Sequence, residues 1–378
     1  MQAVKAPETT RAEVSRSSAE PQRPPAAPRV RPSAAKRIAR GLAFDRIGAV
    51  YVWAAIAVVF ALWVPDRFPQ VETAKQILNA NALTALAALS ITIPLATRVF
   101  DLSFAFTMSL AGVAAAHFVA VGMPLGVALA LALAIAVGIG LVNATVVVVM
   151  RIDSFIATLA TGSLIQSLIT MATGDTPILN LKLAGGFSKI GQTDLGGVTL
   201  PVLYAVVVAL AIWYLLEHTA TGRRLYATGF NPDAARLAGV HVERLRFMSL
   251  VASGGLAGAA GIVLASTIQS GSPSGGTPYL LPAFAAAFLG ATQLKHGRFN
   301  AWGTIIAVLL LGTGTTGLGL ASAPQWAANM FVGVVLIASR VEAFRITASA
   351  PLRSAVVNAF WICVGDPSVA IVCEVHPR

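Results

Sequence analysis

Long apolar runs separated by short polar or basic connections dominate the hydrophobic pattern of this chain. A run of about 20 apolar residues is long enough to cross a bilayer as an α-helix. We therefore predict an all-α polytopic transmembrane helical bundle of about ten spans, in which the short run at 280–294 either spans or re-enters. The ten runs lie at 47–64, 78–97, 103–121, 124–150, 154–173, 200–217, 247–268, 280–294, 301–321 and 327–339.

Composition excludes a water-soluble fold. Hydrophobic residues make up 56% of the 378 residues and charged residues only 11%. Soluble domains carry about a quarter charged residues, so this chain has too little polar surface to face water. The chain is therefore a membrane protein.

The two ends of the chain differ from the apolar core at 47–340. Residues 1–46 are basic and rich in proline, which predicts a disordered cytoplasmic tail, because such a segment cannot bury enough apolar area to order itself. Residues 341–378 form a C-terminal tail of uncertain structure. This tail holds the two cysteines, Cys363 and Cys373, which we interpret as unreactive thiols because no metal-binding pattern accompanies them.

The distribution of charge predicts the orientation of the spans. The net charge is +11, but the basic residues lie in the tails and the short connections, which argues against a nucleic-acid partner. With the N-terminus in the cytoplasm, 23 lysines and arginines fall inside and four fall outside. Basic residues concentrate on the cytoplasmic side and contact anionic lipid head groups, so both ends of the core are predicted to be cytoplasmic.

A basic connection at 218–246 separates two long apolar runs. Its five arginines would be costly in hydrocarbon, so it must lie outside the lipid. Asn231, Pro232 and Asp233 are typical of a helix start, and Gly239 of a helix end. With Leu237 as an exposed apolar residue, the pattern favours a short helix on which a soluble partner docks. A solvated loop whose arginines anchor to head groups is the alternative.

If ATP powers this protein, the sequence motifs place its hydrolysis on another chain. No lysine follows a glycine, so a phosphate-binding loop is absent. The run Gly-Thr-Gly-Thr-Thr-Gly at 312–317 satisfies the dinucleotide pattern literally, but it lies inside an apolar run with no preceding strand. We interpret it, together with Gly254, Gly258 and Gly261, as small residues that let helices approach closely. We expect no catalytic residue, cofactor or metal site.

Ionisable groups are scarce within the runs. Asp101 lies at the edge of one run, where it either has a function or pairs with Arg98. An ion-coupled transporter usually needs acidic or histidine relays at mid-depth, so this class is disfavoured although not eliminated. Neutral side chains suit a hydroxylated solute, and the candidates, which could equally bond neighbouring helices, are Asn81, Asn143, Thr158 and Thr161.

Several short motifs together resemble the permease subunits of the monosaccharide class of ABC importers, the ribose-type family. The likeness covers about 47–340. It rests on Asp-Leu-Ser at 101–103, Phe-Ile-Ala-Thr-Leu at 155–159, Gly-Ala-Thr at 290–292 and the connection at 218–246. In that connection the residues assigned to ATPase coupling are Gly222, Arg223, Tyr226, Gly229, Asn231, Ala234, Ala235, Arg236 and Gly239. The resemblance adds Asp101, Ser103 and Phe155 to the candidate solute pathway.

This resemblance implies a complete transport system in a bacterial inner membrane. The expected partners are cytoplasmic ABC ATPase subunits, a periplasmic solute-binding protein and a second permease copy in a homodimer. The expected activity is ATP-driven import of a sugar or sugar-like solute by alternating access. Nucleosides, a sugar-like signal molecule or branched-chain amino acids are alternative solutes, and a membrane-embedded enzyme is disfavoured because no catalytic cluster is visible.

Overall fold

The computed structural model describes residues 44–293, 297–324, 326–335 and 337. In this part of the chain the regular structure is helical, and no β-strand occurs. Two isolated β-bridges, Ile178 with Gly271 and Asp194 with Thr199, join loop segments. The predicted all-α class is confirmed.

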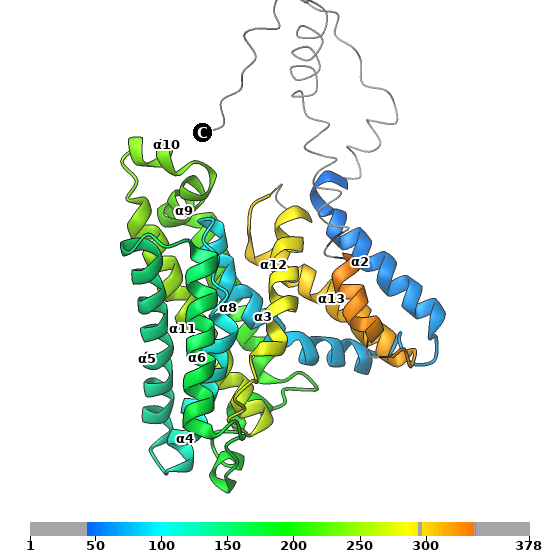
Figure 1. Ribbon diagram of the computed structural model, residues 1–378. Coiled ribbons are helices and arrows are strands. Elements are labelled where there is room, and N and C mark those ends of the chain that lie inside the picture. The colour runs from blue at the N-terminus through cyan, green and yellow to red at the C-terminus, as the bar shows by residue number, and fades with distance from the viewer. Residues whose placement is uncertain (1–43, 294–296, 325, 336, 338–378) are drawn as a thin grey trace, which may run out of the picture. The chain divides into compact units, whose positions relative to one another are not determined.

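Long helices form the body of the structure, and shorter helical turns lie in the connections between them (Figure 1). The long helices are α2 (Phe44–Trp63), α3 (Val71–Ala96), α4 (Phe104–Ala120), α5 (Leu125–Ala144), α6 (Ser154–Thr173), α8 (Leu200–His218), α11 (Val242–Ile268), α12 (Leu280–Gln293) and α13 (Ala301–Leu320). The shorter elements are the π-helical turn η1 (Thr145–Val149), η2 (Leu181–Ala184), α7 (Lys189–Gln192), α9 (Ala220–Phe230), α10 (Pro232–Leu237) and η3 (Thr277–Tyr279).

Local sequence explains several helix ends. The Asp153 carboxylate accepts hydrogen bonds from the backbone N–H groups of Phe155 and Ile156 at 3.0 and 3.3 Å, so it caps the start of α6. Gly174 ends the same helix with φ of 62°, a conformation that glycine adopts without a steric penalty. Pro201 occupies the first turn of α8, where its missing N–H has no intrahelical partner.

All ten predicted runs contain helix, but the number of spans stays a prediction. Among the described residues, six helices are long and apolar enough to cross a membrane: α3, α5 together with η1, α6, α8, α11 and α13. Four shorter apolar helices occur in the same part of the chain, at Val50–Trp63, Phe104–Ala120, Thr277–Thr292 and Trp326–Val335. The run at 280–294 corresponds to α12, whose 14 residues leave open whether it spans or re-enters.

Several predicted boundaries shift in the structure. α2 begins at Phe44, before the expected end of the N-terminal tail at 46, and α3 begins at Val71 rather than at 78. Residues 1–43, the C-terminal tail 341–378 and both cysteines lie outside the described residues.

Helix α11 lies at the centre of the packing and contacts α3, α4 and α5. Its glycines allow this close approach. A Cβ added to Gly254 would lie 2.8 Å from the Ala136 carbonyl oxygen of α5, and one added to Gly261 would overlap the Met108 carbonyl oxygen of α4. The predicted small-residue packing is confirmed for α11.

The Gly-Thr-rich run at 312–317 also packs against neighbouring helices. It lies within α13, where side chains occupy the space beside its glycines: Asn81 at Gly312 and Phe60 at Gly317. Thr313 Oγ1 accepts a hydrogen bond of 2.8 Å from the Trp53 indole nitrogen. The packing interpretation of this run is confirmed.

The predicted orientation can be tested with cysteines at the two ends of α8. This helix has 19 residues, about 28 Å at 1.5 Å per residue, so the connections at its ends lie on opposite sides of a membrane. With Cys363 and Cys373 replaced by serine, we expect Gln192→Cys to react with an impermeant thiol reagent added outside intact cells. Ala238→Cys, also exposed, should react only after permeabilisation. Labelling of Ala238→Cys in intact cells would reverse the orientation.

Candidate functional site

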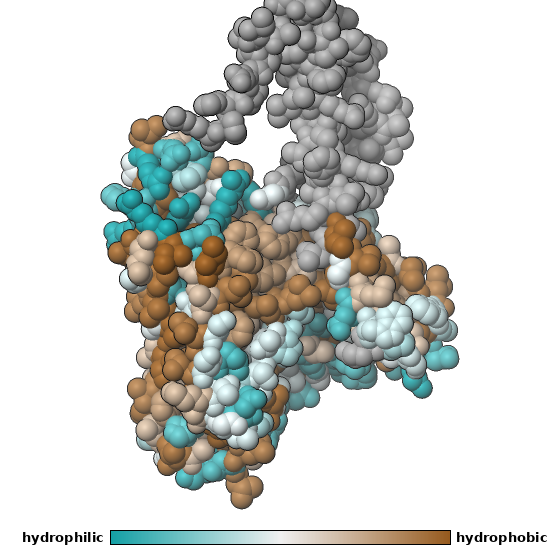
Figure 2. Space-filling model, viewed as in Figure 1, coloured by the Kyte–Doolittle hydropathy of each residue, from teal (hydrophilic) through white to brown (hydrophobic). Residues whose placement is uncertain are grey.

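The basic connection predicted at 218–246 folds into α9, α10 and the first turn of α11. In Figure 1, α9 and α10 lie together at one end of the bundle. Figure 2 shows hydrophilic residues gathered over this end and a hydrophobic surface on the helices below it. This connection is therefore a compact helical unit, which we call the coupling segment.

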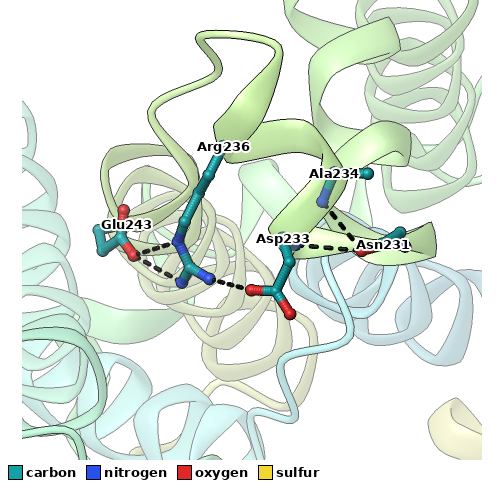
Figure 3. A network of polar contacts seen from close by, with 5 residues as sticks. All are labelled: Asn231, Asp233, Ala234, Arg236 and Glu243. Carbon is teal, nitrogen blue, oxygen red and sulfur yellow. Dashed lines mark hydrogen bonds and ion pairs between the residues drawn. The ribbon is translucent and has the colours of Figure 1, made fainter.

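Helix α10 has both of the ends that its sequence predicts. The Asn231 side-chain oxygen accepts hydrogen bonds from the backbone N–H groups of Asp233 and Ala234 at 3.1 and 3.0 Å (Figure 3). At the other end, Gly239 has φ of 80°, and the N–H of Val240 donates to the carbonyl of Ala235 at 3.0 Å. This pattern closes a helix with a left-handed residue, so both predicted ends are confirmed.

Ion pairs connect the exposed side of α10 to the start of α11. Arg236 lies 2.8 Å from the Asp233 carboxylate and 2.7 Å from the Glu243 carboxylate at the start of α11 (Figure 3). The hydrogen bond from Arg236 lowers the pKa of Glu243, and the same bond raises the pKa of Arg236. Because all three groups are exposed, these pairs orient α10 more than they stabilise it.

Four of the predicted coupling residues are buried, and three of them attach the segment to the bundle. Gly222 and Gly229 lie so close to the backbone carbonyls of Leu215 and Ala96 that no Cβ would fit. The Tyr226 hydroxyl donates to the Phe299 carbonyl at 2.8 Å, and burial raises the pKa of this phenol. Ala235 is 5% exposed, so it packs inside the segment. These residues position the segment and are not available to a docking partner.

The remaining coupling residues present a surface. Arg223, Asn231, Ala234, Arg236 and Gly239 are exposed. Leu237, which sequence analysis singled out as an exposed apolar residue, is 92% exposed. The structure therefore divides the predicted site into an anchoring set and an exposed set with Leu237 at its tip.

Loss of the Asn231 cap should loosen α10 alone. Asn231→Ala removes the acceptor for two backbone N–H groups, which costs about 1 kcal/mol of local helix stability. We expect faster amide hydrogen exchange at residues 232–237 in the variant, with unchanged exchange in α11. Asn231→Asp, which keeps the acceptor, serves as the control. Equal exchange in the alanine variant and the native chain would contradict a capping role.

A second cluster of predicted residues forms a buried polar network between α3 and α4. The Asp101 carboxylate accepts hydrogen bonds from the hydroxyls of Ser103 at 2.6 Å and Ser253 at 2.7 Å. The Asn143 amide donates to the Ser103 hydroxyl at 2.6 Å. The Asn143 side-chain oxygen is buried without a partner among the described residues. Three of the predicted pathway residues thus meet at one point.

Helix α6 holds the backbone beside this network. The Thr158 hydroxyl accepts from the N–H of Leu102 at 3.0 Å, and the Ser154 hydroxyl accepts from the N–H of Phe100 at 3.1 Å. Arg98 makes no ion pair with Asp101, so the alternative that these two residues pair is wrong. The network fixes the non-helical connection between α3 and α4.

The other predicted pathway residues lie elsewhere. Asn81 donates to the Ile77 carbonyl at 2.8 Å and packs on Gly312 of α13. Thr161 bonds the carbonyl of Ala157 within α6, and Phe155 is 50% exposed. These residues do not join the network.

Two network residues were missed by sequence analysis. Ser253 lies in an Ala-Ser-Gly-Gly run whose small residues indicate only packing, and Ser154 lies at the boundary of a predicted span. Each is an isolated serine among apolar residues. Such a serine does not indicate a polar network unless the residue that it contacts on another segment is known.

Comparison with known proteins gives one family match and several relatives. Residues 73–339 match the family described as branched-chain amino acid transport system / permease component. The chain is 33% identical over 285 residues to the ribose import permease protein RbsC of Escherichia coli strain K12, which covers 75% of this chain and 88% of that protein. It is 32% identical over 299 residues to the L-arabinose transport system permease protein AraH of the same strain, covering 79% and 90% of the two chains. It is 24% identical over 299 residues to the D-allose transport system permease protein AlsC, covering 79% and 91%.

Proposed function

This chain belongs to the branched-chain amino acid transport system / permease component family, and from that membership we propose that it is the membrane-spanning subunit of an ATP-driven ABC importer for a sugar or sugar-like solute. As a permease component it is a multi-pass protein of the bacterial inner membrane and not an enzyme. The observation that carries the proposal is that the relatives are permeases named for ribose, arabinose and allose.

The coupling segment is the element proposed to receive the ATPase. The hydrogen bond from Tyr226 to the Phe299 carbonyl attaches it to the bundle, and the ion pairs of Arg236 hold α10 in one orientation. An exposed apolar side chain on a helix held in one orientation can act as an aliphatic anchor in a pocket of a partner. ATP-driven movement of that partner would then displace α9 and α10 and switch the access of the pathway.

A second copy of the chain is proposed to enclose the solute pathway along α6. This helix carries the exposed hydroxyls Ser163, Ser167 and Thr170, whereas α5 exposes only apolar residues and Gly126. The Gln166 side-chain oxygen on the same helix is buried without a partner in the part of the chain that the structure describes. Polar groups are costly against lipid and suit either a polar pathway or a helix partner. These hydroxyls extend the pathway proposed at Phe155 and Thr161 toward the other end of α6.

In the predicted orientation, the external side offers a second docking surface. Leu179 and Leu181, in the connection between α6 and α8, are 74% and 94% exposed, and they line a cavity of about 510 Å³ with Asn180, Ala184 and Gln269. We assign this surface to the solute-binding protein that would deliver the sugar.

The proposed function is tested by reconstitution. The chain is co-expressed with an ABC ATPase and a solute-binding protein of its own organism, and uptake of labelled ribose, arabinose and allose into vesicles is measured with and without internal ATP. We expect no ATP hydrolysis by the chain alone and ATP-dependent uptake by the complete system. Uptake by the chain alone, driven by a proton or sodium gradient, would contradict the proposal. ATP-dependent uptake of leucine or a nucleoside instead of a sugar would contradict the solute class.

A further inference from the structure

A cavity of about 670 Å³ lies at the coupling segment, and Ser154, which holds the backbone beside the polar network, forms part of its wall. The other walls come from the connection between α3 and α4, from η1 and the turn before α6, from α10, and from the start of α11. Four arginines line it: Arg98, Arg151, Arg236 and Arg246. Nothing in the proposed transport cycle requires this cavity.

Three of these arginines have no acidic partner within the described part of the chain. Arg236 takes Asp233 and Glu243, and the lining carboxylate of Asp153 is occupied by the start of α6. Arg98, Arg151 and Arg246 make no ion pair there. The cavity therefore carries an excess of positive charge.

The surroundings of Arg246 indicate that a ligand belongs in the cavity. Its Nε atom is buried and has no hydrogen-bond partner among the described residues. A buried donor without an acceptor is costly, and an anion would satisfy it.

Two of the lining arginines lie at the ends of helices. Arg98 and Arg151 both have φ of 58°. The N–H of Val99 donates to the Pro94 carbonyl at 3.0 Å, and that of Ile152 donates to the Val146 carbonyl at 3.3 Å, so each arginine is the left-handed residue that closes the helix before it. The ends of α3 and η1 thereby each bring one arginine to the same cavity.

The apolar side of the cavity indicates an amphiphilic ligand. Val147 and Val148 of η1 form part of its wall, and the adjoining Val149 and Met150 are 66% and 62% exposed. The cavity thus lies where the apolar surface of a spanning helix gives way to basic residues. Basic pockets between spanning helices on the cytoplasmic side bind the head groups of anionic lipids.

We propose that this cavity binds a phosphate group, and that its occupant is the head group of an anionic phospholipid with an acyl chain along η1. Arg98, Arg151 and Arg246 contact the phosphate. Because Arg236 and Glu243 line the same cavity, the bound lipid lies against the ion pairs that orient α10. The proposal does not rest on the transported solute.

The test measures lipid binding to the purified full-length chain. Native mass spectrometry in detergent gives the dissociation constants of phosphatidylglycerol and phosphatidylcholine with the same acyl chains. The variants are Arg246→Gln and Arg151→Gln, and the matched control is Arg244→Gln, an exposed arginine of the same helix that does not line the cavity. Thermal unfolding of each delipidated variant shows whether it is folded. If Arg246→Gln does not fold, Arg151→Gln still tests the proposal, because Arg151 is exposed and its replacement removes no packing.

We expect phosphatidylglycerol to bind more tightly than phosphatidylcholine and its affinity to fall roughly fivefold for each cavity arginine removed. Arg244→Gln should leave this affinity unchanged. A second arm adds millimolar inorganic phosphate to the delipidated chain. If phosphate raises the unfolding temperature of the native chain but not of Arg151→Gln or Arg246→Gln, while the lipids do not discriminate, the phosphate site stands and its source is soluble. Equal lipid affinities in all variants, together with no effect of phosphate, would overturn the proposal.

Discussion

Leu237→Asp is expected to abolish binding of the ATPase while leaving the permease folded in the membrane. The native side chain is 92% exposed, so the substitution removes no packing within the chain. At a docked surface it would replace an apolar anchor with a charge that must be desolvated. Truncation of a central anchor commonly costs about 2 kcal/mol or more, which corresponds to at least roughly thirtyfold weaker binding. Co-purification of the ATPase with tagged permease, followed by titration, measures the loss.

The matched control for this experiment is Leu181→Asp. Leu181 is 94% exposed and lies in the connection between α6 and α8, on the opposite side from the coupling segment in the predicted orientation. Both variants place the same charge on an exposed leucine, but only Leu237→Asp should weaken ATPase binding. Equal ATPase binding by the two variants would remove α10 from the docking surface.

Two glycines of α11 should respond in opposite ways to the same substitution. Gly261→Ala places a methyl group into the Met108 carbonyl of α4, so α4 and α11 must separate. Overpacking of this kind costs about 1–3 kcal/mol. Gly255→Ala places its methyl group 3.4 Å from the Val137 side chain, an ordinary contact, and gains about 0.5–1 kcal/mol from the better helix propensity of alanine.

Thermal unfolding of the detergent-solubilised chain distinguishes the two outcomes. We expect a lower unfolding temperature for Gly261→Ala and an equal or higher one for Gly255→Ala. Both variants add one methyl group to the same helix. The higher helix propensity of alanine would therefore raise both unfolding temperatures, and it cannot explain changes of opposite sign. If both variants were destabilised to the same extent, the close contact between Gly261 and α4 would not be the cause of the destabilisation.

Features governed by neighbouring residues could be predicted from the sequence. The cap at Asn231 and the left-handed Gly239 follow from local backbone chemistry, and the structure confirms both. The apolar runs likewise predict where helices occur. A run of about 20 apolar residues favours a membrane-spanning helix whatever its neighbours are, so no knowledge of tertiary contacts is needed. The length of α3 was underestimated because its first turns carry Glu72 and Lys75, which form an ion pair, and so fall outside the apolar run.

Features governed by packing between distant segments could not be predicted. Ala235 and Ala234 are adjacent alanines of one short helix, yet the first is buried and the second is exposed. The hydrogen bond from Ser253 to Asp101 joins residues 152 positions apart, and nothing in either local sequence indicates it. The cavity lined by arginines likewise forms only where the α3–α4 connection, η1 and the turn before α6, α10 and the start of α11 meet.

The hydrogen bond between Tyr226 and the Phe299 carbonyl has a mechanical consequence. The Arg298 guanidinium also lies over two aromatic rings of α9, 4.9 Å from the ring centre of Tyr226 and 5.4 Å from that of Phe230. Residues 298 and 299 therefore hold α9 through two rings and one hydrogen bond. The next residue, Asn300, accepts a hydrogen bond from the N–H of Gly303 at 2.7 Å and so caps the start of α13. A movement of α9 must therefore either break these contacts or displace the first turn of α13. Residues 298–300 thus couple the docking end of the molecule to a helix that begins about 70 residues further along the chain.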